Sequence, residues 1–134
     1  MPLRASFMQD YHQLEIWNRA MDYAVHVYEF AAALPGEEKY NLASQLRRAV
    51  TSAPLNIAEG CGSASNAEFG RFLSYAYRSL KEVLTALELC QRLYPVLDTD
   101  RVGLLIDEGS QISRMTRNLI RKVAPEIDTR WSDS

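Results

Sequence analysis

The segment that decides the fold is Ser52-Ala53-Pro54-Leu55-Asn56-Ile57-Ala58-Glu59-Gly60, because it places polar side chains inside an otherwise apolar helical pattern. Residues spaced alternately by four and three positions form the seam along which a helix packs against its neighbours. This seam runs through Leu42, Leu46, Ala49, Ala53, Asn56 and Gly60. Burying an amide without a partner costs on the order of 1–3 kcal/mol. We therefore expect Asn56 to hydrogen-bond to another helix or to a neighbouring subunit.

Four segments with this spacing indicate an all-α protein, since no segment of comparable length alternates with the period of a strand. The predicted helices span 12–34, 38–60, 66–94 and 98–124, and a polar tail follows at 125–134. Turn and capping signals separate them, namely Leu34-Pro35-Gly36, the capping box from Ser65 to Glu68, Pro95 and the N-cap residue Asp98. Short loops between four seams predict one domain, 1–134, folded as an up-down-up-down antiparallel four-helix bundle.

The other three helices have seams of the same kind. The first is predicted to bury Leu14, Trp17, Met21, Ala24, Tyr28 and Ala31; the third Phe69, Leu73, Ala76, Leu80, Val83, Leu87, Cys90 and Tyr94; the fourth Val102, Leu105, Gly109, Ile112, Thr116, Leu119 and Val123. The third helix carries a second stripe at Phe72, Tyr75, Ser79, Glu82, Ala86, Leu89 and Leu93. A monomer would leave part of this wide arc in water, which favours a homo-oligomer. Alternatively, this helix is central in its own bundle and touches all three others.

Composition excludes several classes of protein. Of 134 residues, 47% are hydrophobic, which is enough for a core without disulfides or metals. The net charge of -2 provides no global field to attract nucleic acid or an acidic membrane. Without a signal-peptide pattern or a long apolar run, the sequence predicts a cytoplasmic protein that does not enter a membrane. The two cysteines do not have the spacing of a metal site, since Cys61 lies in a predicted loop and Cys90 on a seam. Neither histidine follows a glutamate by three positions, as a di-metal site in a helical bundle would require. We therefore expect no metal or cofactor.

Three blocks of sequence resemble one known family. They are Gln45-Leu46-Arg47-Arg48-Ala49 with Ser52 and Asn56-Ile57-Ala58-Glu59-Gly60; Phe69, Phe72-Leu73, Ala76, Ser79-Leu80 and Glu82; and an opening helix with Trp17, Ala20, Tyr28, Pro35 and Glu38. Over about 12–124 the chain resembles the S23-like four-helix-bundle proteins encoded in intervening sequences of bacterial 23S rRNA genes. The resemblance implies a homopentameric ring without established enzymatic activity. It also implies distant kinship with accessory proteins of diversity-generating retroelements, which bind nucleic acid together with a reverse transcriptase.

The chain departs from this family at Arg78. In the family a small residue, often glycine, usually precedes the serine that matches Ser79, whereas this chain has an arginine. Arg78 either prevents close packing of the third helix at this point or adds a charge to its surface. The chain is also mildly acidic, whereas the retroelement relatives are strongly basic.

Five polar residues are predicted to form a cluster between the second and third helices. They are Ser52, Asn56, Glu59, Ser79 and Glu82. The favoured interpretation is a hydrogen-bond network that fixes the register of the helices or subunits. The alternative is a small-molecule or catalytic pocket, in which Glu59 and Glu82 would have to supply the acid and base.

Basic residues near the end of the chain form a second candidate site. Arg114, Arg117, Arg121 and Lys122 lie on the last helix, which begins with acidic residues and ends with basic ones. This order complements the helix dipole and needs no ligand. The stripe could instead bind RNA, DNA or an acidic partner, and Arg47, Arg48, Arg71, Arg78 and Lys81 could extend it in a ring.

Two functional hypotheses remain. The first is a non-enzymatic adaptor or scaffold for nucleic acid, for a protein such as a nucleic-acid enzyme, or for both, with no catalytic residues. The second is a helical-bundle ribonuclease of the HEPN type, because Arg19 and His26 fall on one face of the first helix. Trp17 and Tyr28 are interpreted as core residues rather than as stacking platforms for bases.

Overall fold

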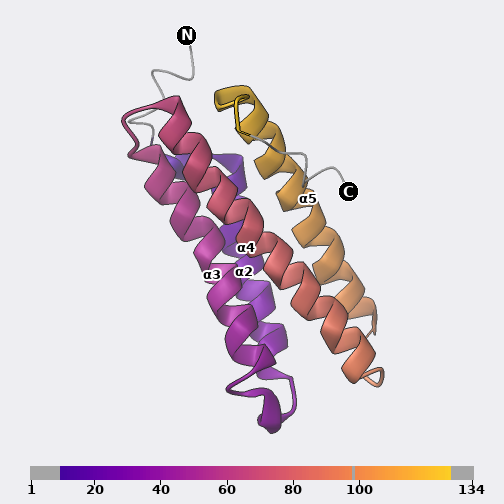
Figure 1. The fold of residues 1–134 in the computed structure, drawn as a ribbon. Helices are drawn as coiled ribbons and strands as arrows, with labels where there is room; N and C mark the ends of the chain where they lie inside the picture. Colours follow the sequence, from indigo (N-terminus) through magenta and orange to yellow (C-terminus); the bar gives the residue numbers. More distant parts are fainter. Residues whose placement is uncertain (1–9, 98, 128–134) are drawn as a thin grey trace.

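The computed structural model describes residues 10–97 and 99–127, and these ranges contain four α-helices: α2 Glu15–Ala32, α3 Leu42–Cys61, α4 Asn66–Leu93 and α5 Thr99–Val123 (Figure 1). Two 3-10 helices, η2 Tyr11–Gln13 and η3 Gly36–Glu38, precede α2 and α3. No strand occurs in the described ranges, so the all-α prediction is confirmed. The predicted cap Asp98 and positions 128–134 of the predicted tail lie outside these ranges.

Helices that follow one another in the chain lie side by side, and α4, the longest, contacts α3 on one side and α5 on the other (Figure 1). Two glycines allow these close approaches. A Cβ at Gly60 would lie 2.9 Å from Phe69 Cδ1, and a Cβ at Gly70 would lie 2.5 Å from Ala124 Cβ. The helices enclose one core, in which Leu46, Leu80 and Ile112 are fully buried.

The second helix begins later than the predicted position 38, because Glu38 belongs to η3. Glu38 is buried, and its carboxylate accepts hydrogen bonds from the backbone N–H of Leu42, at 3.3 Å, and from the hydroxyl of Tyr94. The first amides of a helix need acceptors from outside it, and Glu38 supplies one. The hydrogen bond to Glu38 raises the pKa of Tyr94 to about 12. Glu38 thus joins the start of α3 to the end of α4. The first helix also starts later, at Glu15, after η2.

The predicted seams of α3, α4 and α5 form the core, with Asn56, Tyr94 and Leu119 only partly buried. The predicted seam of the first helix is wrong except at Ala31, which is buried. Helix α2 instead buries Ile16, Ala20, Tyr23, Val27 and Phe30. Met21 and Tyr28 are 43% and 44% exposed, and Trp17 is half-buried.

Helix α2 takes this orientation because Tyr23 fits against α5. Its hydroxyl donates a hydrogen bond of 2.8 Å to the carbonyl of Leu105. A Cβ at Gly109 would lie 2.4 Å from the Tyr23 hydroxyl oxygen, so the phenol occupies space that only a glycine leaves. With Tyr23 turned inward, the neighbouring stripe of Trp17, Met21 and Tyr28 faces outward.

Candidate functional site

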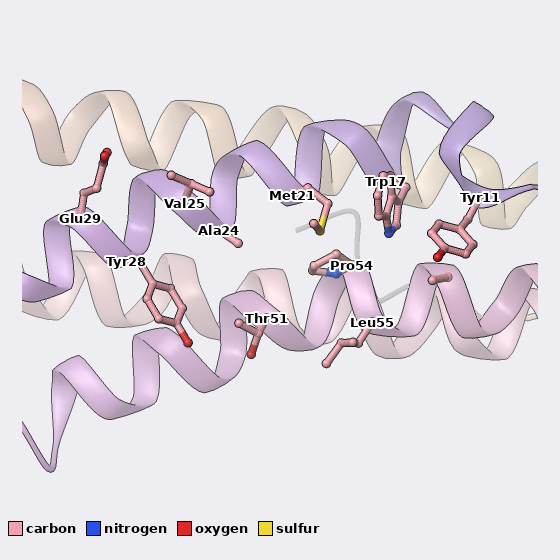
Figure 2. Close-up of a pocket in the computed structure, with 11 residues that line it drawn as sticks. Tyr11, Trp17, Met21, Ala24, Val25, Tyr28, Glu29, Thr51, Pro54 and Leu55 are labelled. Carbon is pink, nitrogen blue, oxygen red and sulfur yellow. The ribbon is translucent and has the colours of Figure 1, made fainter.

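An apolar groove of about 670 Å³ runs between α2 and α3. Figure 2 shows Trp17 and Met21 of α2 on one side of it and Pro54 and Leu55 of α3 on the other. The remaining lining residues are Tyr11, Ala24, Val25, Tyr28, Glu29, Thr51 and Ala58. Only one of the eleven side chains, that of Glu29, is charged.

The side chains of the groove are held in place by local packing. The ring of Tyr11, in η2, meets the ring of Trp17 edge-on at 4.9 Å between centroids. Pro54 is buried within α3, whereas Leu55 beside it is 68% exposed. Apolar surface left in water costs about 25 cal/mol per Å², and a contiguous patch of this kind usually marks an interaction site. The groove is therefore the strongest candidate for a functional surface.

The polar cluster between α3 and α4 is smaller than predicted. The hydroxyl of Ser79 donates to the hydroxyl oxygen of Ser52 at 2.8 Å, which links the two helices. The amide nitrogen of Asn56 donates to the carbonyl and the hydroxyl oxygen of Ser52, at 2.9 and 3.0 Å. Asn56 thus bonds within its own helix, and the expectation that it bonds directly to another helix of the chain is wrong. A four-residue spacing puts the Ser52 carbonyl within reach of this side chain.

Glu59 and Glu82 do not take part in this cluster. Both are exposed, and the hydrogen bonds around Ser52 include neither carboxylate. The acid and base required for a catalytic pocket are therefore not brought together with Ser52, Asn56 and Ser79. On the same side of α4, Tyr75, Leu89 and Leu93 are 41%, 45% and 56% exposed. The second stripe of this helix thus remains partly in water in the single chain.

A polar cleft of about 530 Å³ lies between α2 and α5 and contains both Arg19 and His26. The guanidinium of Arg19 donates to Gln111 Oε1 at 3.1 Å, and His26 Nδ1 lies 3.1 Å from Glu108 Oε1. The predicted shared face is therefore present, and both side chains contact α5. The cleft is lined by three carboxylates, Glu29, Asp107 and Glu108, against the two arginines Arg19 and Arg101, so the acids outnumber the arginines that a phosphodiester would need.

The predicted basic residues lie in separate places on the chain. Arg114 and Arg121 are exposed on α5, and Arg117 between them is half-buried. Lys122 lines a shallow recess with Leu14 of the segment before α2, so it lies toward α2. The other candidates belong to different helices, Arg47 and Arg48 to the early part of α3 and Arg78 to the middle of α4.

The two cysteines are buried, including Cys61, which is the last residue of α3 and not part of a loop. Burial raises the pKa of both thiols to about 11, which leaves little reactive thiolate at neutral pH. No group of three or more metal-ligating side chains occurs in the part of the chain that the structure describes. In that same part, no helix has the length and apolar character to cross a membrane.

Sequence reasoning missed the groove and the capping role of Glu38. A second 3-4 pattern in the first helix, Ile16, Ala20, Tyr23, Val27 and Phe30, was the available signal. Two apolar stripes on one helix indicate that only one of them can face the core of a single chain.

Comparison with known proteins places the chain in a family. Among curated proteins, no relative matches it. A crystal structure of a protein with unknown function from the S23 ribosomal protein family of Bacteroides thetaiotaomicron has a TM-score of 0.73 and 22% sequence identity, covering 79% of this chain and 98% of that one. This likeness supports the fold. The family model of the 23S rRNA-intervening sequence protein matches residues 12–118, which include the polar cluster and every lining residue of the groove except Tyr11. The chain therefore belongs to the 23S rRNA-intervening sequence protein family.

Proposed function

We propose that this protein is a cytoplasmic, non-enzymatic assembly protein. Its unit is an up-down-up-down antiparallel four-helix bundle, and five copies form a ring that acts as an adaptor for a nucleic acid, a protein or both. The apolar groove between α2 and α3 carries this proposal, because it leaves Met21, Tyr28 and Leu55 in water unless another chain covers them.

The single chain has two different apolar surfaces, which favours a ring over a symmetric dimer. One is the groove, and the other is the outer stripe of α4 with Tyr75, Leu89 and Leu93. A contact between two unlike surfaces leaves one of each free on every pair, so subunits add until a ring closes.

The positions of the two surfaces favour a small ring. Both border α3, since the groove contains Leu55 and the α4 stripe contains Ser79, which bonds to Ser52. Two such faces of a four-helix arrangement point outward roughly 90° apart. Closure requires roughly 90° for four copies and roughly 108° for five. An angle of roughly 90° fits four copies, and the five copies implied by the family resemblance require the two faces to open by roughly 18° more.

The adaptor role rests on α5, which borders neither apolar surface. Its exposed Arg114 and Arg121 would be repeated in every subunit of a ring. Repetition strengthens a weak site through effective concentration, and each cation that neutralises a phosphate adds to a salt-dependent affinity. A chain with a net charge of -2 needs such a local, repeated site.

Native mass spectrometry of protein purified at low salt tests the assembly. We expect a mass of five times 15.2 kDa. Additional mass that nuclease removes would support the nucleic-acid role, and a bare ring would contradict that role while leaving the assembly intact. A monomer at micromolar concentration would contradict the whole proposal.

The basic residues can be tested separately by measuring affinity for a single-stranded RNA at several salt concentrations. Arg121→Gln should weaken binding and lower the slope of log affinity against log salt by about one for each phosphate that is no longer neutralised. Lys39→Gln, which removes an exposed cation in the loop before α3, is the matched control and should leave the slope unchanged. Equal slopes for both variants and the wild type would exclude the end of α5 as the site.

A further inference from the structure

A cation lies at one end of the apolar groove. The residues of α3 that line the groove are Thr51, Pro54, Leu55 and Ala58. Arg47 precedes Thr51 by four residues, so it falls on the same side of the helix, and its carbonyl accepts a hydrogen bond of 2.9 Å from the Thr51 hydroxyl. Its guanidinium carbon lies 6.0 Å from the centre of the Tyr28 ring, which also lines the groove. The groove therefore ends beside a half-buried arginine.

Arg47 also lines a recess of about 260 Å³ between the end of α2 and the start of α3. Lys39 lines the same recess, and none of the described residues that line it is acidic. The guanidinium of Arg47 donates to the carbonyl of Lys39 at 3.5 Å, which holds it between the groove and the recess. Two cations without an opposing carboxylate favour an anion at this point.

The charges around the groove give it a direction. Glu29 is its one charged lining residue, but Figure 2 shows the carboxylate directed away from α3, and this residue also lines the cleft toward α5. At the end far from Arg47 lies the ring of Trp17 (Figure 2), and the exposed Glu59 follows the groove residue Ala58. An amphiphile is therefore oriented, with an anionic head beside Arg47 and an apolar tail toward Trp17.

The size and shape of the groove fit one chain. Figure 2 shows the small side chains of Ala24 and Thr51 between the larger Met21 and Tyr28, which leaves the groove open there. Its volume of about 670 Å³ lies within the roughly 300–1,000 Å³ typical of small-molecule pockets. At 1.5 Å per residue, α3 advances by about 16 Å from Arg47 to the last lining residue. A long apolar groove with a cation at one end fits an acyl chain that carries a carboxylate.

We infer that the α2–α3 groove binds a free long-chain fatty acid, with its carboxylate beside Arg47 and Lys39. The chain runs past Met21 toward Trp17. This inference rests on the proposed function, because it makes the fatty acid a competitor of the neighbouring subunit for the same groove. A bound chain covers the apolar side chains that a second copy would otherwise cover. A subunit with an occupied groove cannot join a ring through this surface.

Calorimetric titration at neutral pH, with dodecanoate below the concentration at which it forms micelles, tests the contact of the head group. The wild type should bind one dodecanoate per chain, and dodecylamine, with the same chain and a positive head, should bind at least tenfold more weakly. Arg47→Gln should weaken dodecanoate binding about tenfold, because a charge-assisted hydrogen bond is lost. Arg48→Gln removes an exposed cation that does not line the groove and is the matched control. Equal affinities of the two variants, or of the two amphiphiles, would overturn the inference.

The position of the chain is tested by its length and by a blocked groove. Each methylene group that leaves water should strengthen binding about threefold to fourfold, so octanoate should bind at least tenfold more weakly than dodecanoate. Ala24→Phe fills part of the groove and should weaken dodecanoate binding at least tenfold, whereas Ala67→Phe, at an exposed position of α4, should not. Circular dichroism confirms that each variant remains helical. Similar affinities for octanoate and dodecanoate, or an unaffected Ala24→Phe variant, would contradict binding in the groove.

Sedimentation velocity with and without ligand separates this inference from the ring itself. We expect saturating dodecanoate to dissociate the wild-type ring, and the same concentration to leave an Arg47→Gln ring intact. A ring that stays assembled with dodecanoate bound would overturn the competition and leave the ring standing. A wild-type protein that is monomeric at every concentration without ligand would overturn the ring, and the titrations would still decide whether the groove binds a fatty acid.

Discussion

Two clefts of similar size flank α2, and their chemistry is opposite. The groove toward α3 has a volume of about 670 Å³ and is lined by Trp17, Met21 and Tyr28. The cleft toward α5 has a volume of about 530 Å³ and contains Arg19 and His26, bonded to Gln111 and Glu108. The polar cleft can stay hydrated at little cost, whereas the apolar groove is unfavourable in water until it is covered.

The difference teaches how one helix can serve two purposes. On the side toward α5, α2 forms the hydrogen bonds that hold its own chain together. On the side toward α3, it presents aromatic and sulfur-containing side chains that the chain itself does not cover. A surface of this kind is typical of a subunit contact, and a partly hydrated polar cleft is not.

The largest expected effect comes from placing a charge in the groove. Met21→Glu should abolish assembly, because covering an unpaired carboxylate costs on the order of 3–5 kcal/mol. The fold should persist, since Met21 is 43% exposed in the single chain. His26→Glu places the same charge on the other side of α2 and should still assemble. Size-exclusion chromatography with light scattering measures the mass of each variant. An assembled Met21→Glu variant would contradict the claim that the apolar groove, and not the polar cleft, is the subunit contact.

The orientation of α2 should depend on the fit of Tyr23 against Gly109. Gly109→Ala puts a Cβ 2.4 Å from the phenol oxygen and should lower the free energy of unfolding by about 1–3 kcal/mol. Gly103→Ala, on the same helix, meets no atom within 4 Å and should raise it by about 0.5–1 kcal/mol. Urea denaturation measures both. Equal effects would mean that this contact does not set which stripe of α2 is buried.

The bond between α3 and α4 should contribute less. Ser79→Ala removes the link to Ser52 and should lower the free energy of unfolding by about 1 kcal/mol. Thr85→Ala removes a hydroxyl that bonds to the Lys81 carbonyl of the same helix and is the control. Thermal unfolding should show a lower melting temperature for Ser79→Ala than for Thr85→Ala. Equal melting temperatures would mean that the bond between Ser79 and Ser52 does not stabilise the contact between α3 and α4.

The smallest effect is expected in the polar cleft. His26→Ala removes an exposed contact with Glu108 and should change the free energy of unfolding by about 0–1 kcal/mol. The ribonuclease hypothesis predicts that the same variant loses enzymatic activity. Turnover of RNA by the wild type that disappears in an intact His26→Ala assembly would contradict the non-enzymatic proposal.

The helices and most of their seams could be predicted because the seams of α3 and α5 have no apolar competitor, and the second stripe of α4 is interrupted by the polar residues Ser79 and Glu82. The buried stripe of α2 could not be predicted, because that helix has two stripes and neither is interrupted by a charged residue. The choice between them depends on Tyr23 fitting beside Gly109, a contact between distant parts of the sequence.

The contacts of the polar residues also include some that could be predicted from the sequence and some that could not. The link between Ser52 and Ser79 could be predicted, since both lie on adjacent helical faces. The partner of Asn56 could not, because a backbone carbonyl one turn away competes with every partner on another helix. The spacing predicts Glu38 inside a helix, although its side chain caps one from outside.

Hydroxyl-radical footprinting of the assembled and the diluted protein tests most directly whether the groove is covered by a second copy. Trp17, Met21 and Tyr28 carry readily oxidised side chains, and all three line the groove. The account predicts that they are protected at concentrations where the ring forms and labelled on dilution. Met115, a residue of α5 that contacts Arg19 of α2, should be labelled equally in both states. Equal labelling of the groove residues in an intact ring and in the monomer would contradict it.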